Sequence, residues 1–364
     1  MCALSAPASV SEANSFSYKS IYRCYLECRR NKRNSINALN FEFDAEINVL
    51  KLQRELKTRT YHPSRSILFA ASKPKLREIF AADFRDRVVH HILIDYLKRI
   101  WEPIFIHDSY ACRDGKGTHR AVIRLQDFIR SITCNGNIRA YYLQLDIKDF
   151  FMSIDKEILF ELIRRKVKDP DMLWLTRVVL FWDCTSSYVR RGDPSLLANI
   201  LPHKSLFGKE NVRGLPIGNL TSQFFANVYM NELDQFVKHQ LKVKHYVRYV
   251  DDFVILSEDS QELRGFKSEI EEFIHIRLKL NLHPSRQKLL TVCNGIDFLG
   301  YIVRHNYKLV RARVVNNLKE KIRQFRKMRV RNYTKLRITM ASYFGHFKFA
   351  NTYRLKSRFM NYVK

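Results

Sequence analysis

The hydrophobic pattern changes along the chain from a helical period to an alternation of strands and helices. Residues 40–56 and 84–100 repeat apolar positions every three or four residues, which predicts amphipathic helices. Two short apolar runs between them, Ser66–Ala70 and Arg77–Ala81, are joined by a basic turn and predict a β-hairpin. From residue 140 to 300, strand-like runs alternate with helical segments, which indicates a mixed α/β unit.

The charge is concentrated at the end of the chain. The sequence has 364 residues, 46% of them hydrophobic, so it predicts a globular protein with two or three subdomains. Its formal net charge is +28, and residues 302–364 carry eighteen basic residues against one acidic residue. Aromatic residues interleave with these charges and predict packed helices. Such a one-sided basic surface predicts a polyanionic partner, for which nucleic acid is the natural ligand.

Several classes of protein are not expected. The longest apolar stretch, residues 88–106, contains six histidines or charged residues, so it predicts an amphipathic helix and no membrane span. The first ten residues lack the basic and long apolar regions of a secretory signal. The seven cysteines lack zinc-ligand spacing, and no zinc is expected. Cys24 and Cys28, one helical turn apart, are interpreted as reduced thiols of a cytoplasmic protein.

Two adjacent aspartates interrupt an apolar run. Residues Tyr246–Leu256 predict a strand, a tight turn that contains Asp251 and Asp252, and a second strand. An ordinary turn explains the pair as well as a metal site does, because aspartate is a favoured turn residue. Both flanks are apolar enough to be buried, however, and two carboxylates beside a buried sheet are costly to desolvate. A divalent cation would neutralise them, and oxygen ligands suit Mg²⁺.

Asp146 is the candidate for a third carboxylate. It ends the strand-like run 141–146 and precedes a helix-like segment at 155–160. A solvated strand end is the simpler explanation of Asp146 alone, whereas its pairing with Asp251 favours a shared metal site. Two metal ions bridged by such carboxylates can activate an attacking hydroxyl group and stabilise a leaving pyrophosphate.

Glycine-rich segments surround these acids. Gly214-Leu-Pro-Ile-Gly218 leads into a predicted helix with Thr221 or Ser222 near its start. Its glycines would let the backbone approach a ligand closely, although a common loop-to-helix junction has the same composition. Residues 185–213 contain two glycines and two prolines and predict an irregular insertion. The segment 108–118 lacks the spacing of a nucleotide-binding P-loop.

Taken in order, these segments resemble a reverse transcriptase from about residue 60 onward. Asp146-Ile-Lys-Asp-Phe-Phe151 resembles the first catalytic motif, and Gly214–Gln223 resembles the motif that contacts template and nucleotide. Tyr249-Val-Asp-Asp252 resembles the polymerase hairpin, and Phe298-Leu-Gly-Tyr301 resembles the primer-gripping turn. Each motif alone is weak, but the four in this order are highly specific.

The resemblance implies an α/β (α+β) fold of the right-hand polymerase type. Residues 1–60 would form an N-terminal helical extension and residues 61–140 the fingers. Residues 141–301 would form a ferredoxin-like palm with an insertion at about 160–213, and residues 302–364 a basic helical thumb. No RNase H or endonuclease domain is expected after the thumb.

The resemblance also implies the catalytic centre. Asp146, Asp251 and Asp252 would be catalytic acids and metal ligands, and the carbonyl group of Ile147 would complete the shell of two Mg²⁺ ions, with Mn²⁺ as a substitute. The ring of Phe151 would exclude a 2′-hydroxyl group and so favour deoxynucleotides. A place in the hydrophobic core is the alternative for this ring.

Further implied contacts surround that centre. The nucleotide would be contacted by Lys75, Arg77, Arg87, Gly218, Gln223 and Lys288. The primer and template would be contacted by Phe298, Leu299, Gly300, Arg113 and Lys116. Arginine suits bidentate contacts with phosphate and lysine acts as a point charge, although the basic fingers hairpin can also be an ordinary solvated surface.

The finer resemblance is to reverse transcriptases of diversity-generating retroelements, which copy a template RNA with errors at adenines alongside a small accessory protein. It rests on Ser222-Gln223, where many relatives have Ser-Pro, on the segments 86–91 and 109–113, and on the late segment 343–353. Related bacterial enzymes defend against phage by copying a dedicated structured non-coding RNA. Their motifs overlap with these, so both roles stay open.

The implied function is therefore an RNA-directed DNA polymerase that makes cDNA from deoxynucleoside triphosphates. Its partners would be a template or non-coding RNA and either an accessory protein or a second copy of the chain, without a membrane. Template-independent or protein-primed synthesis is an alternative. A non-catalytic RNA-binding scaffold is another, but a scaffold has no physical need for three clustered acids.

Overall fold

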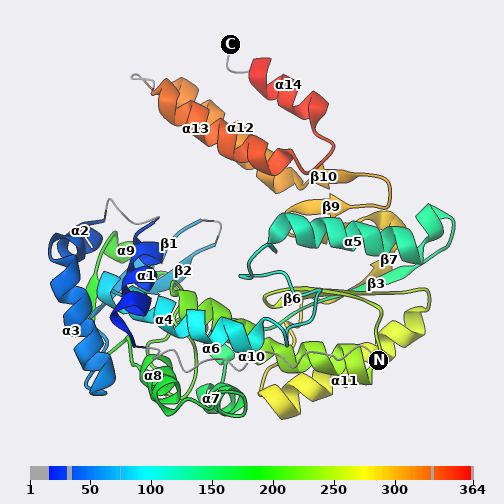
Figure 1. Ribbon diagram of the computed structural model, residues 1–364. Helices are drawn as coiled ribbons and strands as arrows, with labels where there is room; N and C mark the ends of the chain where they lie inside the picture. Colours follow the sequence, from blue (N-terminus) through cyan, green and yellow to red (C-terminus); the bar gives the residue numbers. More distant parts are fainter. Residues whose placement is uncertain (1–15, 31–34, 74, 329–331, 362–364) are drawn as a thin grey trace, which may run out of the picture. The chain divides into compact units, whose positions relative to one another are not determined.

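Residues 16–30, 35–73, 75–328 and 332–361 are described by the computed structural model of the protein (Figure 1). The chain divides into two compact units, each assembled from separate segments. The first unit comprises Met1–Phe105, Asp149–Glu232 and His275–Leu280, and the second unit comprises Ile106–Lys148, Leu233–Ile274 and Asn281–Lys364. Both contain helices and strands, which confirms the predicted mixed architecture.

Three helices begin the first unit, α1 (Tyr18–Arg29), α2 (Ile36–Phe43) and α3 (Ala45–Lys57), and a fourth helix, α4 (Phe84–Trp101), comes after a β-hairpin. Helix α1 packs against α3 and α4. The continuous helix predicted over 40–56 is wrong, because Asp44 leaves the helical conformation at φ −122° and ψ 47° and separates α2 from α3. The helix predicted over 84–100 is confirmed, but the one over 88–106 ends at Trp101, two residues before Pro103.

The first unit also contains a three-stranded sheet with the order β2-β1-β4. Strands β1 (Ser66–Ala71) and β2 (Arg77–Ala81) pair in antiparallel register, which confirms the predicted hairpin. Strand β4 (Tyr188–Arg190) pairs in parallel with β1. The prediction of an irregular insertion over 185–213 is therefore wrong in part, because this segment supplies β4, the short helix α9 (Pro194–Ala198) and the 3₁₀ turn η2 (Pro202–Lys204).

The other helices of this part of the chain are α6 (Phe150–Ser153), α7 (Lys156–Arg164), α8 (Pro170–Phe181) and α10 (Leu220–Gln235). Helices α7 and α8 pack together, and α8 also contacts α4. Helix α10 starts after the Gly214–Gly218 turn, as predicted, and is followed by the π-helical segment η3 (Phe236–Gln240).

The second unit is built on a four-stranded antiparallel sheet with the order β5-β6-β3-β7. Its strands are β3 (Tyr141–Asp146), β5 (His245–Tyr249), β6 (Asp252–Ser257) and β7 (Lys288–Thr291). Helix α5 (Thr118–Ile132) packs against β5 and β6. The 3₁₀ turn η1 (Cys134–Gly136) follows α5, and helix α11 (Ser260–Leu278) follows β6. The strand, turn and strand predicted over 246–256 are confirmed.

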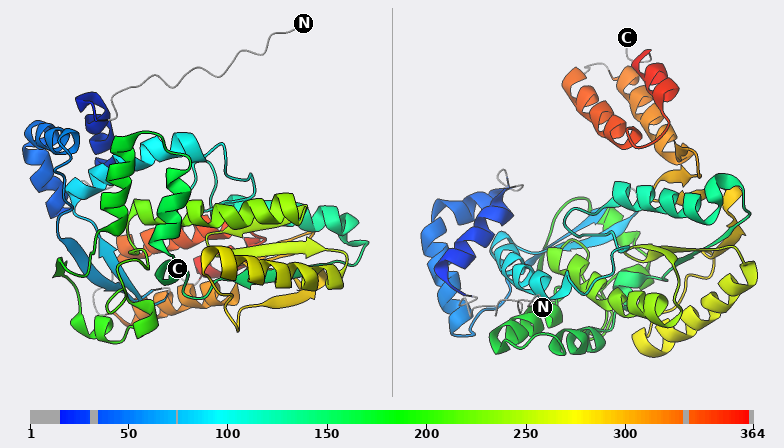
Figure 2. Two further views of the ribbon diagram at one scale, coloured as in Figure 1. Left: turned by 90° about the horizontal axis from the view of Figure 1, so that it is seen from below. Right: turned by 45° about the vertical axis from the view of Figure 1, so that its right-hand side comes forward.

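A second small sheet leads into the basic end of the chain. After the 3₁₀ turn η4 (Val292–Asn294), strands β8 (Ile296–Phe298), β9 (Tyr301–Val303) and β10 (Lys308–Val310) pair in sequence. Helices α12 (Ala312–Lys327), α13 (Tyr333–Phe347) and α14 (Tyr353–Asn361) follow. The prediction of packed helices over 302–364 is therefore confirmed from Ala312 onward and wrong before it, because β9 and β10 occupy the start of this segment. Helices α12 and α13 lie side by side (Figures 1 and 2).

One hydrophobic core joins these parts of the second unit. It runs from Val122 in α5 through Val254 in β6 and Tyr301 in β9 to Phe347 in α13. The basic helices are thus anchored by apolar side chains to the sheet that carries the predicted catalytic acids.

Among the described residues, no helix is both long and apolar enough to cross a membrane. The six described cysteines are free thiols, Cys24 and Cys28 are buried, and burial raises the pKa of the Cys24 thiol to about 12. The predicted reduced state of this pair is consistent with these findings. Cys2 and the first ten residues lie outside the described residues.

Candidate active site

Asp146 and Asp252 are register partners on the neighbouring antiparallel strands β3 and β6. In the β5–β6 hairpin, Tyr249 pairs with Asp252, so Val250 and Asp251 form the two-residue turn that connects the strands. Directly opposite residues of an antiparallel pair are near neighbours on one face. The structure therefore gathers the three predicted catalytic acids at one end of the four-stranded sheet.

Asp252 has an environment that disfavours its charged form. Burial raises its pKa to about 7; a hydrogen bond from Gln144 lowers this pKa, and the negative charges of Asp146 and Asp251 raise it. A cation beside these carboxylates would relieve both the desolvation and the repulsion. The electrostatics at the strand end therefore fit a positively charged ligand.

Asp146 is held by the segment that precedes β7. Its backbone carbonyl accepts a hydrogen bond of 2.8 Å from the amide of His283, and its carboxylate oxygen Oδ2 accepts one of 2.7 Å from Arg286 Nη1. The other carboxylate oxygen, Oδ1, is buried without a hydrogen-bond partner. An orphaned carboxylate oxygen of this kind suits a hard divalent cation. Ile147, which is buried, forms an isolated antiparallel bridge with Leu282.

The acids share a strand end without forming a closed cage. Within the described ranges, no group of three or more His, Cys, Asp and Glu side chains is close enough to hold a metal ion. The guanidinium group of Arg286 neutralises one carboxylate oxygen of Asp146, as a bound metal ion would. The donor set of three carboxylates is nevertheless that of an oxygen-liganded divalent ion.

Gln144 was missed by sequence reasoning. Its amide nitrogen donates hydrogen bonds of 3.1 Å to Asp252 Oδ1 and to the backbone carbonyl of Asp297. Gln144 therefore connects a predicted catalytic acid with the strand that enters the predicted primer turn. A signal was present, because this polar residue lies in an apolar strand two positions before Asp146, on the same face.

The predicted primer-gripping turn joins β8 to β9. Phe298 is fully buried at the end of β8, and Leu299 and Gly300 both have positive φ, of 50° and 91°. A Cβ atom at Gly300 would lie 3.4 Å from the ring of His346, so the turn packs closely against α13. Lys288, the predicted pyrophosphate contact, is exposed on β7 as the register partner of Gln144.

The predicted template contacts Arg113 and Lys116 belong to the loop before α5. Arg113 donates hydrogen bonds to the carbonyl groups of Ile106 and Ser109, at 2.6 and 3.1 Å. Lys116 donates one of 2.9 Å to the carbonyl group of His107. Both cations therefore brace their own loop in this structure.

The remaining predicted contacts lie in the first unit. Lys75 and Arg77 are exposed at the β1–β2 hairpin, and Gln223 is exposed in the first turn of α10. Arg87 in α4 donates a hydrogen bond of 2.8 Å from Nε to the carbonyl group of Ala82. Gly218 has φ +125°, and a Cβ atom there would lie only 2.8 Å from Ile79 Cγ2.

The Gly214–Gly218 segment is joined to the β1–β2 hairpin. The amide of Phe80 donates to the carbonyl group of Ile217 at 3.0 Å, and the amide of Ala82 donates to Asn219 Oδ1 at 2.9 Å. Two predicted nucleotide-contacting segments are thereby fixed to each other. This link between residues more than a hundred positions apart gave no local signal in the sequence.

The two phenylalanines after Asp149 have different environments. Phe150 is buried, whereas Phe151 is half-buried and packs against the cluster of Leu68, Phe80, Met152, Cys184 and Leu206. Their rings meet edge to face with centroids 5.4 Å apart. Phe151 is thus accessible enough to contact a ligand while being supported by the core.

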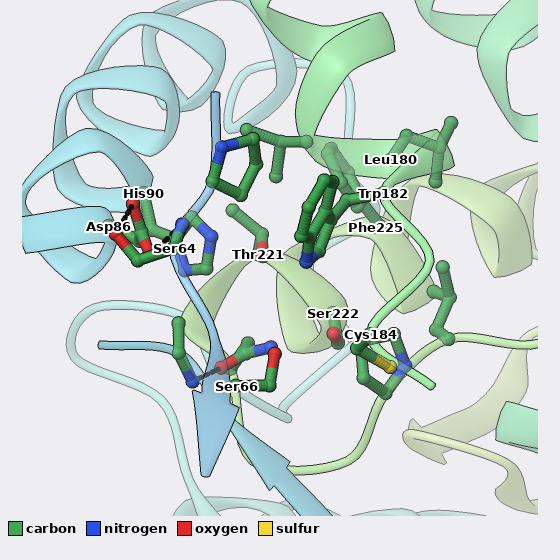
Figure 3. Close-up of a pocket in the computed structure, with 16 residues that line it drawn as sticks. Ser64, Ser66, Asp86, His90, Leu180, Trp182, Cys184, Thr221, Ser222 and Phe225 are labelled. Carbon is green, nitrogen blue, oxygen red and sulfur yellow. Dashed lines mark hydrogen bonds between the residues drawn. The ribbon is translucent and has the colours of Figure 1, made fainter. Parts of the chain in front are cut away.

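A small cavity of about 30 Å³ also lies in the first unit (Figure 3). Its lining includes Asp86, His90, Trp182, Thr221 and Ser222. Burial lowers the pKa of His90 to about 3, so its ring is neutral. None of the predicted catalytic, nucleotide or primer residues lines the cavity, and it has room for about one water molecule.

A mixed α/β protein whose antiparallel sheet presents three acids at one strand end has the architecture expected of a polymerase. The family model described as reverse transcriptase (RNA-dependent DNA polymerase) matches residues 70–303, which is more than half of the chain. The chain belongs to the reverse transcriptase family. This membership and the mixed architecture confirm the predicted fold class, an α+β right-hand polymerase.

Several curated proteins are similar to the chain. The group II intron-encoded protein LtrA of Lactococcus lactis subsp. cremoris is 24% identical, over 77% of this chain and 56% of that protein. Protein YkfC of Escherichia coli (strain K12) is 23% identical, over 75% of this chain and 76% of that protein. The retron Ec73 reverse transcriptase of Escherichia coli is 26% identical, over 53% of this chain and 58% of that protein. The chain spans little more than half the length of LtrA.

Among solved structures, a telomerase from Candida albicans in complex with a fragment of telomeric RNA aligns with a TM-score of 0.44 at 12% identity. The alignment covers 73% of this chain and 51% of the telomerase chain.

Proposed function

We propose that this protein is an RNA-directed DNA polymerase that copies an RNA into cDNA. The observation that carries the proposal is the register pairing of Asp146 with Asp252, with Asp251 in the adjoining turn. A half-buried strand end has no structural need for three neighbouring carboxylates, whereas nucleotidyl transfer needs them to hold cations. Membership of the reverse transcriptase family supports the same reaction.

The three aspartates and the carbonyl group of Ile147 would hold two Mg²⁺ ions, for which Mn²⁺ could substitute. When bound, such ions lower the pKa of an attacking 3′-hydroxyl group and stabilise the leaving pyrophosphate. The orphaned Oδ1 of Asp146 and the raised pKa of Asp252 support this assignment. Lys288, exposed on β7, is proposed as the contact for the pyrophosphate.

The deoxynucleotide and the primer are assigned to the segments named above. Lys75, Arg77 and Arg87 would bind the triphosphate, and the half-buried ring of Phe151 would exclude a 2′-hydroxyl group. Gly218 and Gln223 would lie beside the incoming base. Phe298, Leu299 and Gly300 would hold the primer, and Arg113 and Lys116 the template. In this account residues 61–140 act as fingers, 141–301 as palm and 302–364 as thumb.

The RNA would lie along the basic helices at the end of the chain. In α12 only Leu318 and Ile322 are buried, and its lysines and arginines from Arg313 onward are exposed. Glu320 is the one acid of residues 302–364 and it pairs with Arg323. A helix that is apolar on one stripe and basic elsewhere suits contacts with successive phosphates.

The RNA that is copied is proposed to be the template RNA of a diversity-generating retroelement, because of the resemblance at Ser222-Gln223. Sequencing the RNA that co-purifies with the protein, and the cDNA made from it, tests this role. Errors confined to adenines would support it. Faithful copies of one structured RNA would instead favour phage defence.

The polymerase proposal is tested by primer extension with Asp251→Asn and Asp252→Asn variants. Extension should be lost while RNA binding persists. Full biological function in a variant with Asp146, Asp251 and Asp252 all replaced by alanine would contradict catalysis and support an RNA-binding scaffold.

A further inference from the structure

The turn that carries Asp251 has an uncommon backbone conformation. Val250, the residue before Asp251, has φ +59°, in the left-handed region. A β-branched residue is strongly disfavoured there, because its side chain crowds the backbone. The register of β5 and β6 leaves only Val250 and Asp251 to make the turn, so the conformation of Val250 sets the direction in which Asp251 projects. Something must hold this conformation.

The side chain of Arg248 makes a direct contact with the turn. Arg248 is fully buried, and its Nη1 donates a hydrogen bond of 2.9 Å to the carbonyl group of Val250. The other nitrogens are anchored elsewhere: Nε donates to Asp234 Oδ1 at 2.7 Å and Nη2 to Asp234 Oδ2 at 2.5 Å. Nη2 also donates to Ser109 Oγ at 3.1 Å. A planar guanidinium group can make all of these contacts at once, and an ammonium group cannot.

The anchor of Arg248 is itself fixed from two sides. Asp234 in α10 is fully buried and accepts a further hydrogen bond of 2.8 Å from the hydroxyl group of Tyr246. The segment Asp108–Tyr110 lies along β5, since the amide of Arg248 donates to the carbonyl group of Asp108 and the amide of Tyr110 to that of Arg248, both at 3.0 Å. The guanidinium group therefore has little freedom to move away from the turn.

The energetic cost of the buried Arg248–Asp234 ion pair indicates that it positions the turn and does not mainly stabilise the fold. A buried ion pair is costly to desolvate, and apolar residues of similar size would stabilise the same core as well or better. A fully buried arginine that reaches a strained turn next to a predicted catalytic acid therefore has a more specific use than packing.

We propose that Arg248 is a positioning residue of the polymerase site, which holds the Val250 carbonyl group and thereby orients Asp251 at the strand end. Asp234 and Ser109 fix the guanidinium group for this purpose. This inference rests on the proposed polymerase function, but its main test does not require activity.

The test compares Arg248→Lys with the double variant Arg248→Lys, Val250→Gly. Lysine keeps the charge for Asp234 but cannot also reach the turn. Glycine adopts positive φ without strain and is the residue preferred at the first position of some two-residue hairpin turns. With glycine at position 250, the turn should therefore keep its conformation largely without the hydrogen bond from Arg248. Arg304→Lys is the matched control, because Arg304 also donates to a backbone carbonyl group, that of Cys293, away from this turn.

The first readout is hydrogen exchange of the backbone amides of residues 249–252, measured without divalent ions. Arg248→Lys should raise exchange there by roughly tenfold, the change that one hydrogen bond from a charged group accounts for. The exchange rates of the β3 amides should stay near those of wild type. In the double variant, the exchange rates of residues 249–252 should return most of the way to the wild-type values. A uniform rise across the sheet in Arg248→Lys would show a merely structural role and overturn the proposal.

The second readout is the Mg²⁺ concentration at half-maximal primer extension. It should rise several-fold in Arg248→Lys and fall back in the double variant. An unchanged Mg²⁺ requirement together with unchanged exchange would also overturn the proposal. A wild-type protein that does not extend primers would refute the polymerase function, and the exchange experiment would still decide whether Arg248 holds the turn.

Discussion

Gln144 donates a hydrogen bond of 3.1 Å from its amide nitrogen to the carboxylate of Asp252, two residues from its own register partner Val254. The same nitrogen donates to the carbonyl group of Asp297, one residue before the predicted primer turn begins. Asp297 in turn pairs with Arg311, which precedes α12. This chain of contacts gives a physical connection from the candidate catalytic acid to the basic helices, all within the second unit.

Replacement of Gln144 by leucine should slow primer extension. The substitution keeps the volume of the side chain but removes a hydrogen bond to a charged group, so the rate should fall by about tenfold while RNA affinity is unchanged. Gln126→Leu is the control, because Gln126 is also a buried glutamine of the second unit but bonds to the carbonyl group of Arg304. Single-turnover extension rates measure the effect. A wild-type rate for Gln144→Leu would show that the hydrogen bond from Gln144 to Asp252 does not contribute to catalysis.

Gly218 and Gly265 should respond in opposite directions to alanine. Gly218 has φ +125° and no room for a Cβ atom beside Ile79, so Gly218→Ala should destabilise the protein by about 1–3 kcal/mol. Gly265 lies inside α11 with open space around it, so Gly265→Ala should stabilise the protein by about 0.5–1 kcal/mol. Urea unfolding measures both. Equal effects of the two substitutions would contradict this description of the Gly214–Gly218 turn.

Asp155 should make the stability depend on pH. It caps α7 by accepting hydrogen bonds from the amides of Glu157 and Ile158, and it pairs with Lys279. Burial raises the pKa of Asp155, but Lys279 and these amides lower it by more, so its pKa in the folded protein lies below the ordinary value. The stabilisation is therefore complete above the unfolded pKa of about 3.9 and is lost as the pH falls through the lower folded value.

Asp155→Asn isolates this contribution, since asparagine also caps helices well. The variant should be less stable than wild type by roughly 1 kcal/mol at pH 7, a modest value because Lys279 is half exposed. The difference in free energy of unfolding should shrink as the pH falls below about 4. A difference that stays constant with pH would mean that the charge of Asp155 is not involved.

The basic surface of α12 should control the salt dependence of RNA binding. Lys319→Glu combined with Arg326→Glu should weaken binding to different RNA sequences alike and reduce the slope of log affinity against log salt by about one to two. Arg264→Glu is the control, because this exposed residue lies on α11 next to several glutamates. Fluorescence anisotropy at several salt concentrations measures the slopes. An unchanged slope in the double variant would place the RNA elsewhere.

Local pattern sufficed to predict the elements that carry the candidate acids. Strand β3 and the β5–β6 hairpin have short-range signals, because alternation and turn chemistry are properties of neighbouring residues. The Leu299–Gly300 turn was expected only from the resemblance to reverse transcriptases. Helix 40–56 was predicted as continuous because its apolar period crosses Asp44 without interruption. Only the structure reveals that the chain bends there.

Contacts between distant segments could not be predicted in the same way. The parallel pairing of β4 with β1 joins Tyr188 to Ser66, and nothing in either strand specifies its partner. Gln144 and Arg248 each look like isolated polar residues in apolar strands. Their roles depend on their hydrogen-bond partners, Asp297 for Gln144 and Asp234 for Arg248, which only the fold brings beside them.

Catalysis by the acids at the strand end is tested most directly by primer extension on an RNA template with the Asp252→Asn variant, for which Asp149→Asn is the matched control. Asp149 belongs to the same sequence motif as Asp146, and its left-handed conformation, at φ +46°, is one that asparagine adopts readily. Asp252→Asn should bind RNA normally but yield no extension product, whereas Asp149→Asn should extend the primer. Extension by Asp252→Asn at the wild-type rate would contradict catalysis by these acids.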